Sequence, residues 1–124
     1  MPNKKKILLV EDDQISAKMM QNFLAVKNFD VVIIHNGNDV IPAIVKEKPD
    51  LILMDVQIAG TSGVEVAKIL KSTEEFKKIP LFMVSAYTKE KISDELPPNT
   101  YDEIVEKPVV FKDFLLLIEK YLDT

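Results

Sequence analysis

The stretch KILLVEDD, residues 6–13, decides the fold, because a short apolar run ends abruptly on three acids. Ile7–Val10 has the length and the aliphatic content of a strand that is buried on both faces of a parallel sheet. Three later apolar runs also end near a single polar residue. These are Leu51–Met54 before Asp55, Leu81–Val84 before Ser85, and Ile104–Val105 before Lys107.

Strand-like and helix-like segments alternate along the chain. The predicted strands are 5–10, 30–34, 51–54, 80–84 and 103–105, and the predicted helices are 14–27, 38–48, 64–72, 89–95 and 110–122. Asp13 is the expected N-cap of the first helix, because a short acidic side chain can accept a hydrogen bond from the first turn. This alternation predicts an α/β fold of three layers, with helices on both faces of a five-stranded parallel sheet and right-handed crossovers.

Composition limits the classes of protein to which the chain can belong. Its 124 residues form one expected domain, 1–124, that is large enough to bury a core. With no cysteine it can form neither a disulfide nor a thiolate metal site, which fits a reducing cytoplasm. No apolar run is long enough for a signal peptide or a membrane span. The net charge of -4 and the scattered lysines argue against direct nucleic-acid binding.

The polar residues that follow the strands define the candidate site. The carboxyl ends of parallel strands meet at one edge of a sheet, where ligands bind in open α/β folds. We therefore expect Glu11–Asp13, Asp55, Ser85 and Lys107 to meet in one cleft. Carboxylates are the ligands that Mg²⁺ prefers, while a hydroxyl and a lysine suit phosphoryl oxygens. The pattern indicates a divalent cation and a phosphoryl group.

In this order and at these strand ends, the residues resemble the receiver domain of two-component response regulators, chemotaxis regulators among them. The matching residues are the acidic pair Glu11-Asp12, Asp55, Ser85-Ala86 and Lys107-Pro108, and the resemblance covers the whole chain. The resemblance implies a doubly wound, flavodoxin-like sheet with the strand order 2-1-3-4-5. It also implies a phosphoprotein that acts in phosphorelay signal transduction.

The resemblance implies a role for each acid of the site. Asp55 is the expected phosphoacceptor. Asp12, Asp55 and the backbone carbonyl of Gln57 are expected to bind Mg²⁺, with Glu11 acting through a water. Asp13 is then a helix cap rather than a ligand, although the run of three acids leaves that assignment open.

The remaining matched residues are expected to contact the phosphoryl group. Lys107 is the fixed cation that pairs with Asp55 and later with a phosphoryl oxygen, and Ser85 donates to another. The Lys107–Pro108 bond resembles the cis peptide of the family; an X-Pro bond adopts cis at a cost of only about 0.5–1 kcal/mol.

Several positions depart from the family pattern or tune it. Ala59 replaces the usual proline four residues after Asp55, and Ile104 replaces the usual aromatic residue three before Lys107. Gln57 and Tyr87 occupy positions that influence hydrolysis in the family, and we expect the bulk of Tyr87 to slow dephosphorylation.

The leading function is a phosphoacceptor switch that receives a phosphoryl group on Asp55 from a histidine kinase or a histidine phosphotransfer protein. It catalyses only its own phosphorylation and dephosphorylation, so it is not a conventional enzyme. The alternative is a pseudo-receiver, a phosphorylation-independent interaction module, which Ala59 and Ile104 favour and the complete acid, hydroxyl and lysine set opposes. A phosphohydrolase is disfavoured, because Gln57 stands where such enzymes carry a second acid.

Other features leave more than one interpretation. Ile15 and Met19 are consistent with a docking patch for the kinase or with ordinary packing of the first helix. His35, the single histidine, is interpreted as a loop residue rather than a ligand or a phosphodonor. The output partner is unknown, and the chain is either a stand-alone receiver or part of a longer regulator or hybrid kinase.

Overall fold

The sheet has the predicted number, direction and order of strands. The computed structural model describes residues 4–56, 60, 62–86, 90 and 96–122. Its five strands pair in parallel in the order β2-β1-β3-β4-β5. They are β1 (Lys6–Val10), β2 (Asp30–Ile34), β3 (Leu51–Asp55), β4 (Leu81–Ser85) and β5 (Glu103–Glu106). This confirms the doubly wound, flavodoxin-like arrangement.

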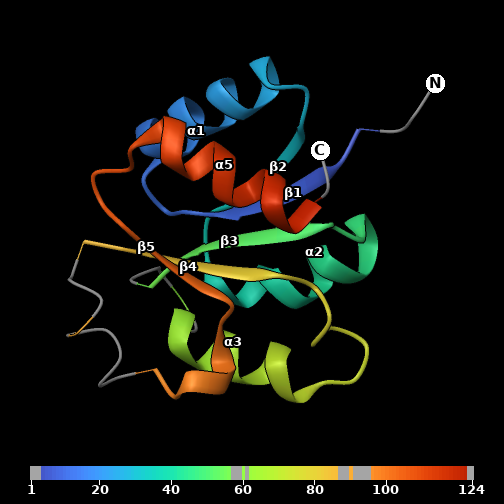
Figure 1. Cartoon of the computed structure of the whole chain (residues 1–124). Helices are drawn as coiled ribbons and strands as arrows, with labels where there is room; N and C mark the ends of the chain where they lie inside the picture. The colour runs from blue at the N-terminus through green and yellow to red at the C-terminus, as the bar shows by residue number, and fades with distance from the viewer. Residues whose placement is uncertain (1–3, 57–59, 61, 87–89, 91–95, 123–124) are drawn as a thin grey trace.

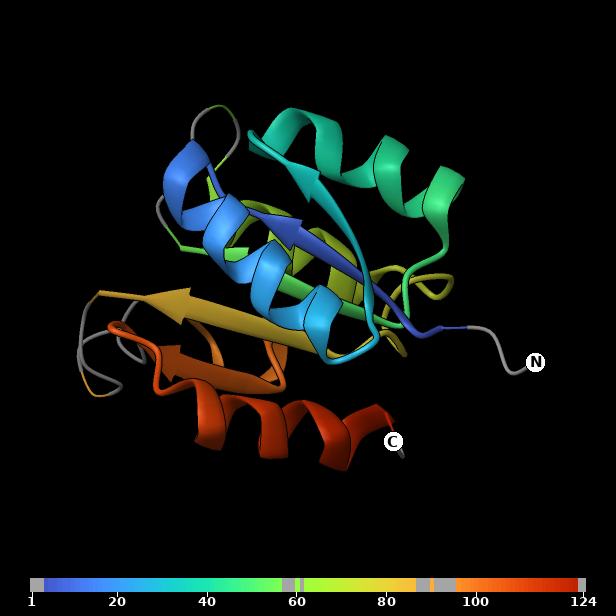
Figure 2. The same ribbon diagram turned by 90° about the horizontal axis from the view of Figure 1, so that it is seen from above.

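Helices cover both faces of the sheet. The α-helices are α1 (Gln14–Val26), α2 (Val40–Glu47), α3 (Gly63–Ser72) and α5 (Phe111–Leu122). Helices α1 and α5 lie on one face, and α2 and α3 lie on the other (Figure 1). Figure 2, seen from above, shows α5 running along the β5 edge of the sheet. Among the described residues, no helix combines the length and apolar character needed to cross a bilayer.

Two hydrophobic clusters hold the layers together, one on each face of the sheet. Alternate residues of β1 point to opposite faces, so Leu8 packs with Ile44 and Leu70 while Leu9 packs with Leu24 and Ile118. Every residue of β3 and of β4 is buried, and each large apolar side chain buried in this way contributes roughly 1.5–3 kcal/mol. The central strands therefore hold the side chains at their carboxyl ends in fixed positions.

The observed elements differ from the expected ones mainly at their ends. The helix expected from residue 38 starts as a 3₁₀ turn, Gly37–Asp39, because the Asn36 side chain accepts a hydrogen bond from the Asp39 amide at 3.1 Å. A second 3₁₀ turn, Pro98–Thr100, precedes β5. The helix expected at 89–95 falls outside the described residues, of which only residue 90 belongs to that range.

Candidate functional site

The register of the sheet brings the site residues together. Val10 lies opposite Met54, and Asp55 lies opposite Val84, so Glu11 and Asp55 occupy the ends of neighbouring strands. The Val56 amide donates to the Val84 carbonyl at 3.0 Å, which continues the ladder past Asp55. Asp55 is therefore the last residue of a buried strand, and the ladder to β4 continues one residue beyond it.

Three carboxylates form a cluster at this edge. Each of Glu11, Asp12 and Asp55 offers one oxygen that lies within 4.8 Å of the others. Glu11 and Asp55 are 6% and 9% exposed, whereas Asp12 is open to solvent. A set of oxygen donors that is buried on one side and open on the other fits a hard divalent cation that keeps several waters, such as Mg²⁺.

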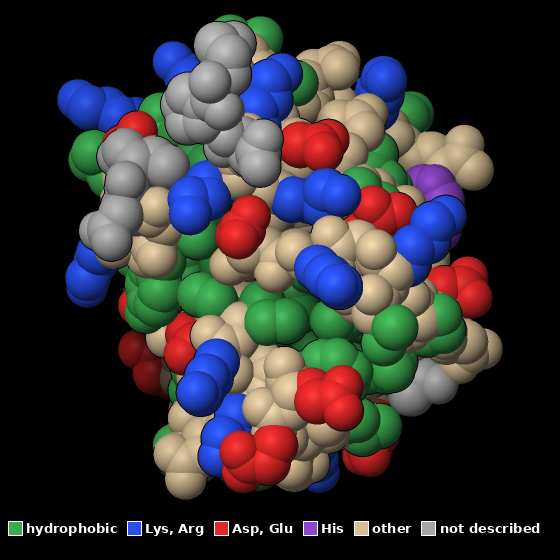
Figure 3. All heavy atoms as spheres, turned by 90° about the vertical axis from the view of Figure 1, so that its right-hand side faces the viewer, with side chains coloured by type: hydrophobic (Ala, Val, Ile, Leu, Met, Phe, Trp, Pro, Cys, Tyr) green, Lys and Arg blue, Asp and Glu red, His purple; other side chains and the backbone are tan. Residues whose placement is uncertain are grey.

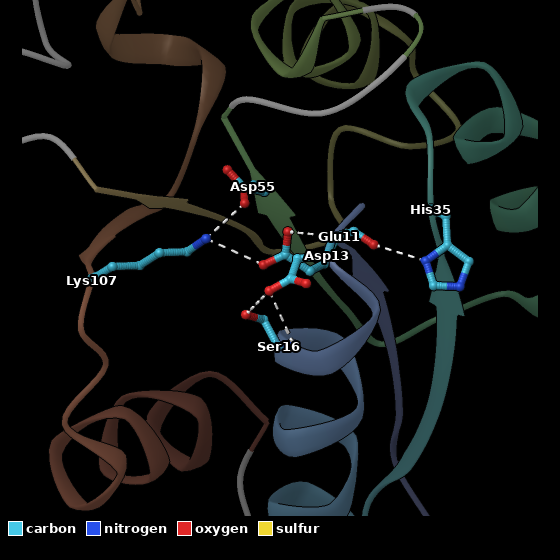
Figure 4. A network of polar contacts seen from close by, with 6 residues as sticks. All are labelled: Glu11, Asp13, Ser16, His35, Asp55 and Lys107. Atoms are coloured by element: carbon cyan, nitrogen blue, oxygen red, sulfur yellow. Dashed lines mark hydrogen bonds and ion pairs between the residues drawn. The ribbon is translucent and has the colours of Figure 1, made fainter.

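Lys107 reaches across the cleft to two of these carboxylates. Its Nζ lies 2.7 Å from Oδ2 of Asp55 and 3.2 Å from Oε1 of Glu11, as Figure 4 shows. Burial opposes the charge on Lys107, but the hydrogen bond and charge of Asp55, together with Glu11, raise its pKa above the usual value. The ammonium is therefore a permanent positive charge beside Asp55.

The Glu11 carboxyl is less easily ionised than an ordinary glutamate. Burial, followed by the hydrogen bond and charge of Asp55, raises the pKa of Glu11, and Lys107 offsets this only in part. The effect of burial is thus not fully offset by one lysine that Glu11 shares with Asp55. The site as it stands has room for further positive charge.

The backbone places Ser85 and Lys107 at the same edge. Ser85 ends β4 and is 2% exposed, and its carbonyl accepts a hydrogen bond from the Lys107 amide at 2.7 Å. The Lys107–Pro108 peptide bond is cis, as the resemblance implied. Gln57, Ala59 and Tyr87, which lie two to four residues beyond Asp55 and Ser85, fall outside the described residues.

Asp13 has a separate role, although it follows Asp12 directly. Its carboxylate accepts hydrogen bonds from the amide and hydroxyl of Ser16, which makes it the N-cap of α1. The Ser16 hydroxyl in particular lowers the pKa of Asp13. This confirms the predicted cap and leaves Glu11, Asp12 and Asp55 as the clustered acids.

An apolar groove opens beside the carboxylates. It has a volume of about 640 Å³ and extends from Asp55 and Lys107 along α1 and α5, with Met19 and Phe111 among its lining residues. Ile15 and Met19 are 74% and 60% exposed, so packing inside the core does not account for them. This favours the docking interpretation of these two side chains.

Of two further positions considered in the sequence, Ile104 lies in the core and His35 lies beside the site. Ile104 is 8% exposed and lies in the cluster that packs against α2 and α3, so it is a core residue in this structure. His35 lies just beyond β2, and its Nδ1 is 3.0 Å from the Glu11 carbonyl oxygen. Sequence reasoning missed that contact, although the strand order 2-1-3 already places the end of β2 beside the end of β1.

Known proteins share both the sequence pattern and the fold. The family model described as the response regulator receiver domain matches residues 7–119. The polar-differentiation response regulator DivK of Brucella anthropi is 28% identical over 118 residues, which cover 95% of this chain and 96% of DivK.

Solved structures of receiver domains superpose over nearly the whole chain. The BeF3-activated N-terminal receiver domain of Klebsiella pneumoniae RstA has a TM-score of 0.88 at 22% identity, covering 97% of this chain and 100% of that one. The chemotaxis response regulator CheY4 of Vibrio cholerae has a TM-score of 0.86 at 20% identity, covering 95% and 98%. With its acids, hydroxyl and lysine at the strand ends that the pattern requires, this chain belongs to the receiver domain family of two-component response regulators.

Proposed function

We propose that the chain is a phosphoacceptor switch of a phosphorelay, and that Asp55 receives the phosphoryl group. The observation that carries the proposal is the contact of Lys107 with both Asp55 and Glu11 at 2.7 and 3.2 Å, with Asp12 within 4.8 Å in the same cluster. An ion pair that served stability alone would need one carboxylate, whereas this arrangement gathers three beside one fixed cation.

The proposed reaction is a transfer from a phosphohistidine of a histidine kinase or a histidine phosphotransfer protein. An Asp55 carboxylate oxygen attacks phosphorus, so an O–P bond forms while the P–N bond breaks and its electron pair returns to the imidazole. Lys107 offsets the repulsion between the carboxylate and the phosphoryl oxygens, and the Ser85 hydroxyl donates to one of them. Phosphoryl transfer asks a protein mainly for this positioning and charge neutralisation.

The carboxylates fit a resident metal ion. Asp12 and Asp55 would hold Mg²⁺ directly and Glu11 would hold it through a water, with the Gln57 carbonyl as a further expected ligand. When bound, the ion supplies the positive charge that Lys107 alone does not provide.

The phosphorylated domain is a signal rather than a catalyst of an independent reaction. Phosphorylation of Asp55 changes the charge of the pocket and raises the population of an active conformer. Water later attacks the acyl phosphate and restores the carboxylate, so the domain turns over only its own modification. We place this switch in the cytoplasm, a placement with which the lack of cysteine is compatible.

A small acyl phosphate and Mg²⁺ test the proposal through the intact mass of the protein. We expect the wild-type chain to gain the mass of one phosphoryl group, and Asp55→Asn to gain none. Asp13→Asn is a matched control, because Asp13 lies in the same acidic run but caps α1, and it should still be phosphorylated. An unmodified wild-type protein, or a phosphorylated Asp55→Asn protein, would favour the pseudo-receiver instead.

We also propose that the apolar groove and the exposed α1 side chains receive the protein donor. Met19→Lys places a charge in the groove and should slow transfer from a phosphorylated donor protein, while leaving the reaction with a small acyl phosphate unchanged. Val26→Lys is the matched control, since Val26 is 82% exposed at the far end of the same helix. Equal transfer rates for the two variants would exclude this groove as the docking site.

Direct nucleic-acid binding is not part of the proposal. The net charge is -4, and on the face seen in Figure 3 lysine and acidic side chains are interspersed rather than separated. A protein that binds a phosphate backbone usually gathers its basic residues into one patch.

A further inference from the structure

The end of β2 holds the backbone of Glu11 on both sides. The Glu11 amide donates to the Ile34 carbonyl at 2.9 Å, and Nδ1 of the next residue, His35, lies 3.0 Å from the Glu11 carbonyl oxygen. Figure 4 shows the ring of His35 pointing at this carbonyl, from the opposite side of Glu11 to Lys107. Two consecutive residues, Ile34 and His35, therefore contact the backbone amide and the backbone carbonyl of Glu11.

The contact with the Glu11 carbonyl indicates which nitrogen of the His35 ring carries a proton. A carbonyl oxygen can only accept a hydrogen bond, so Nδ1 must carry the proton that it donates. In most proteins the hydrogen bond made by one ring nitrogen sets which nitrogen bears the proton. The structure thus predicts an Nδ1–H tautomer for His35 at a pH where the ring is neutral.

The backbone of His35 is held on both sides by regular structure. It is preceded by β2 and followed by Asn36, which accepts from the Asp39 amide at 3.1 Å and donates to the Asp39 carboxylate at 2.8 Å. Because the strand and the capped turn hold the backbone on either side, the ring can transmit that rigidity to Glu11.

The Glu11 carbonyl belongs to the planar peptide unit that joins Glu11 to Asp12. Rotation about the Glu11 Cα–C bond would turn this unit and move Asp12 relative to Glu11 and Asp55. We propose that His35 is a positioning residue for the metal site: its Nδ1–H holds the Glu11–Asp12 peptide in the orientation that places Asp12 beside Glu11 and Asp55. The inference rests on the proposed function, because it concerns the affinity of the same site for Mg²⁺.

Mg²⁺ titration of the unphosphorylated protein, followed by the amide NMR signals of the site, tests the inference without any phosphoryl transfer. Loss of a partner that orients a metal ligand typically weakens binding roughly 10–100-fold. His35 acts through a peptide unit, so we expect His35→Ala to weaken Mg²⁺ binding about tenfold, at the lower end of that range. His35→Asn should restore most of the affinity, because its side-chain amide can donate from a position close to that of Nδ1.

Gln21→Ala is the matched control. Gln21 also donates from its side chain to a backbone carbonyl of β2, that of Val31, at 3.2 Å and away from the acids. It should bind Mg²⁺ as the wild-type protein does. Nitrogen-15 NMR of the His35 ring, recorded on the wild-type protein and on Gln21→Ala, should show the proton on Nδ1.

The outcomes separate the inference from the proposed function. Wild-type-like Mg²⁺ binding by His35→Ala, failure of His35→Asn to restore affinity, or a proton on Nε2 would each overturn the role of His35 and leave the phosphoacceptor proposal standing. A wild-type protein that binds no Mg²⁺ would overturn both.

Discussion

Asp55 can attack a negatively charged phosphoryl group only if the charge of its own carboxylate is partly neutralised. Two buried carboxylates face each other at the end of the sheet, and Lys107 is bonded to both. The pKa of Glu11 nevertheless stays raised, mainly through burial and then through Asp55. Burial, with the added effect of Asp55, thus leaves Glu11 harder to ionise even beside Lys107, and this is the physical reason to expect a divalent cation at this position.

The raised pKa of Glu11 predicts how Mg²⁺ binding depends on pH. Mg²⁺ favours the ionised form of a carboxylate that it contacts directly or through a water, so in acidic solution the ion competes with a proton that Glu11 holds more tightly than an ordinary glutamate does. Mg²⁺ affinity should therefore start to fall at a pH above the ordinary Glu pKa of 4.5 and continue to fall as the solution becomes more acidic. Calorimetric titration with Mg²⁺ over a series of pH values measures this dependence.

Glu11 also affects the stability of the fold, and its stabilising contribution becomes smaller, not larger, as the pH rises. For an acid whose folded pKa is raised, the stabilising contribution is present below the unfolded value and is lost as the pH rises through the folded pKa. In a chelator at neutral pH, Glu11→Gln should therefore melt above the wild-type protein. Glu74→Gln, at a side chain that is 85% exposed, should melt close to the wild type. A lower melting temperature for Glu11→Gln would contradict this account of the site.

Gly63 packs so closely against the backbone of Asp55 that even one added methyl group should destabilise the fold. A Cβ at Gly63 would lie 2.7 Å from the Asp55 carbonyl oxygen and 2.8 Å from that of Val56, and backbone atoms cannot move aside as a side chain can. Overpacking of this kind typically costs about 1–3 kcal/mol. Gly63→Ala should lower the free energy of unfolding by that amount and also slow phosphorylation, because it displaces Asp55.

Ser62→Ala separates those two effects. It removes the hydrogen bond from the Glu65 amide to the Ser62 hydroxyl at 3.2 Å, a helix cap whose loss costs roughly 0.5–2 kcal/mol. Denaturant unfolding should show a loss in both variants, whereas the phosphorylation rate should fall only in Gly63→Ala. Equal rates in both would show that Gly63 does not set the position of Asp55.

Secondary structure was predictable where burial alone determines it. The apolar runs at 7–10, 51–54 and 81–84 each form a strand, because a segment buried on both faces must be apolar throughout. The ends were less predictable: β3 and β4 each include one more residue, Asp55 and Ser85, because their ladders extend past the apolar run. Hydrogen bonds to a neighbouring strand leave no mark in the local sequence.

Side-chain links between elements were also invisible in the sequence. Lys71, in the last turn of α3, donates to the carbonyls of Lys77 and Ile79 at 3.1 and 2.9 Å and to the Asp102 carboxylate at 2.7 Å. The same carboxylate accepts from the Leu81 amide at 2.7 Å. One lysine thus joins α3 to the segment that enters β4 and to the residue before β5.

Lys71→Met should therefore destabilise the fold by about 1–3 kcal/mol, since it removes three hydrogen bonds and takes the Lys71 donor from the part-buried Ile79 carbonyl. The control is Lys68→Met, because Lys68 is exposed and lies 3.8 Å from Glu65 on the same helix, a kind of pair worth roughly 0–1 kcal/mol. Denaturant unfolding of the two variants gives the comparison. Equal free energies of unfolding would refute the structural role of Lys71.

At the scale of the whole molecule, the parallel sheet is what makes the site. Lys107 is 96 positions from Glu11 and 52 from Asp55 in the chain, yet its ammonium touches both carboxylates. The sequence predicted this meeting because strand ends share one edge of a parallel sheet. It did not predict the apolar groove or the contact of His35, since both depend on how side chains pack around that edge.

Chemical mapping of the phosphorylated residue tests the central claim most directly. Borohydride reduces an acyl phosphate of aspartate to homoserine, so a protein treated with an acyl phosphate and Mg²⁺, reduced and digested, records the modified position in its peptide masses. We expect homoserine at position 55 and nowhere else. Homoserine at position 12 or 13, or none at any position, would contradict it.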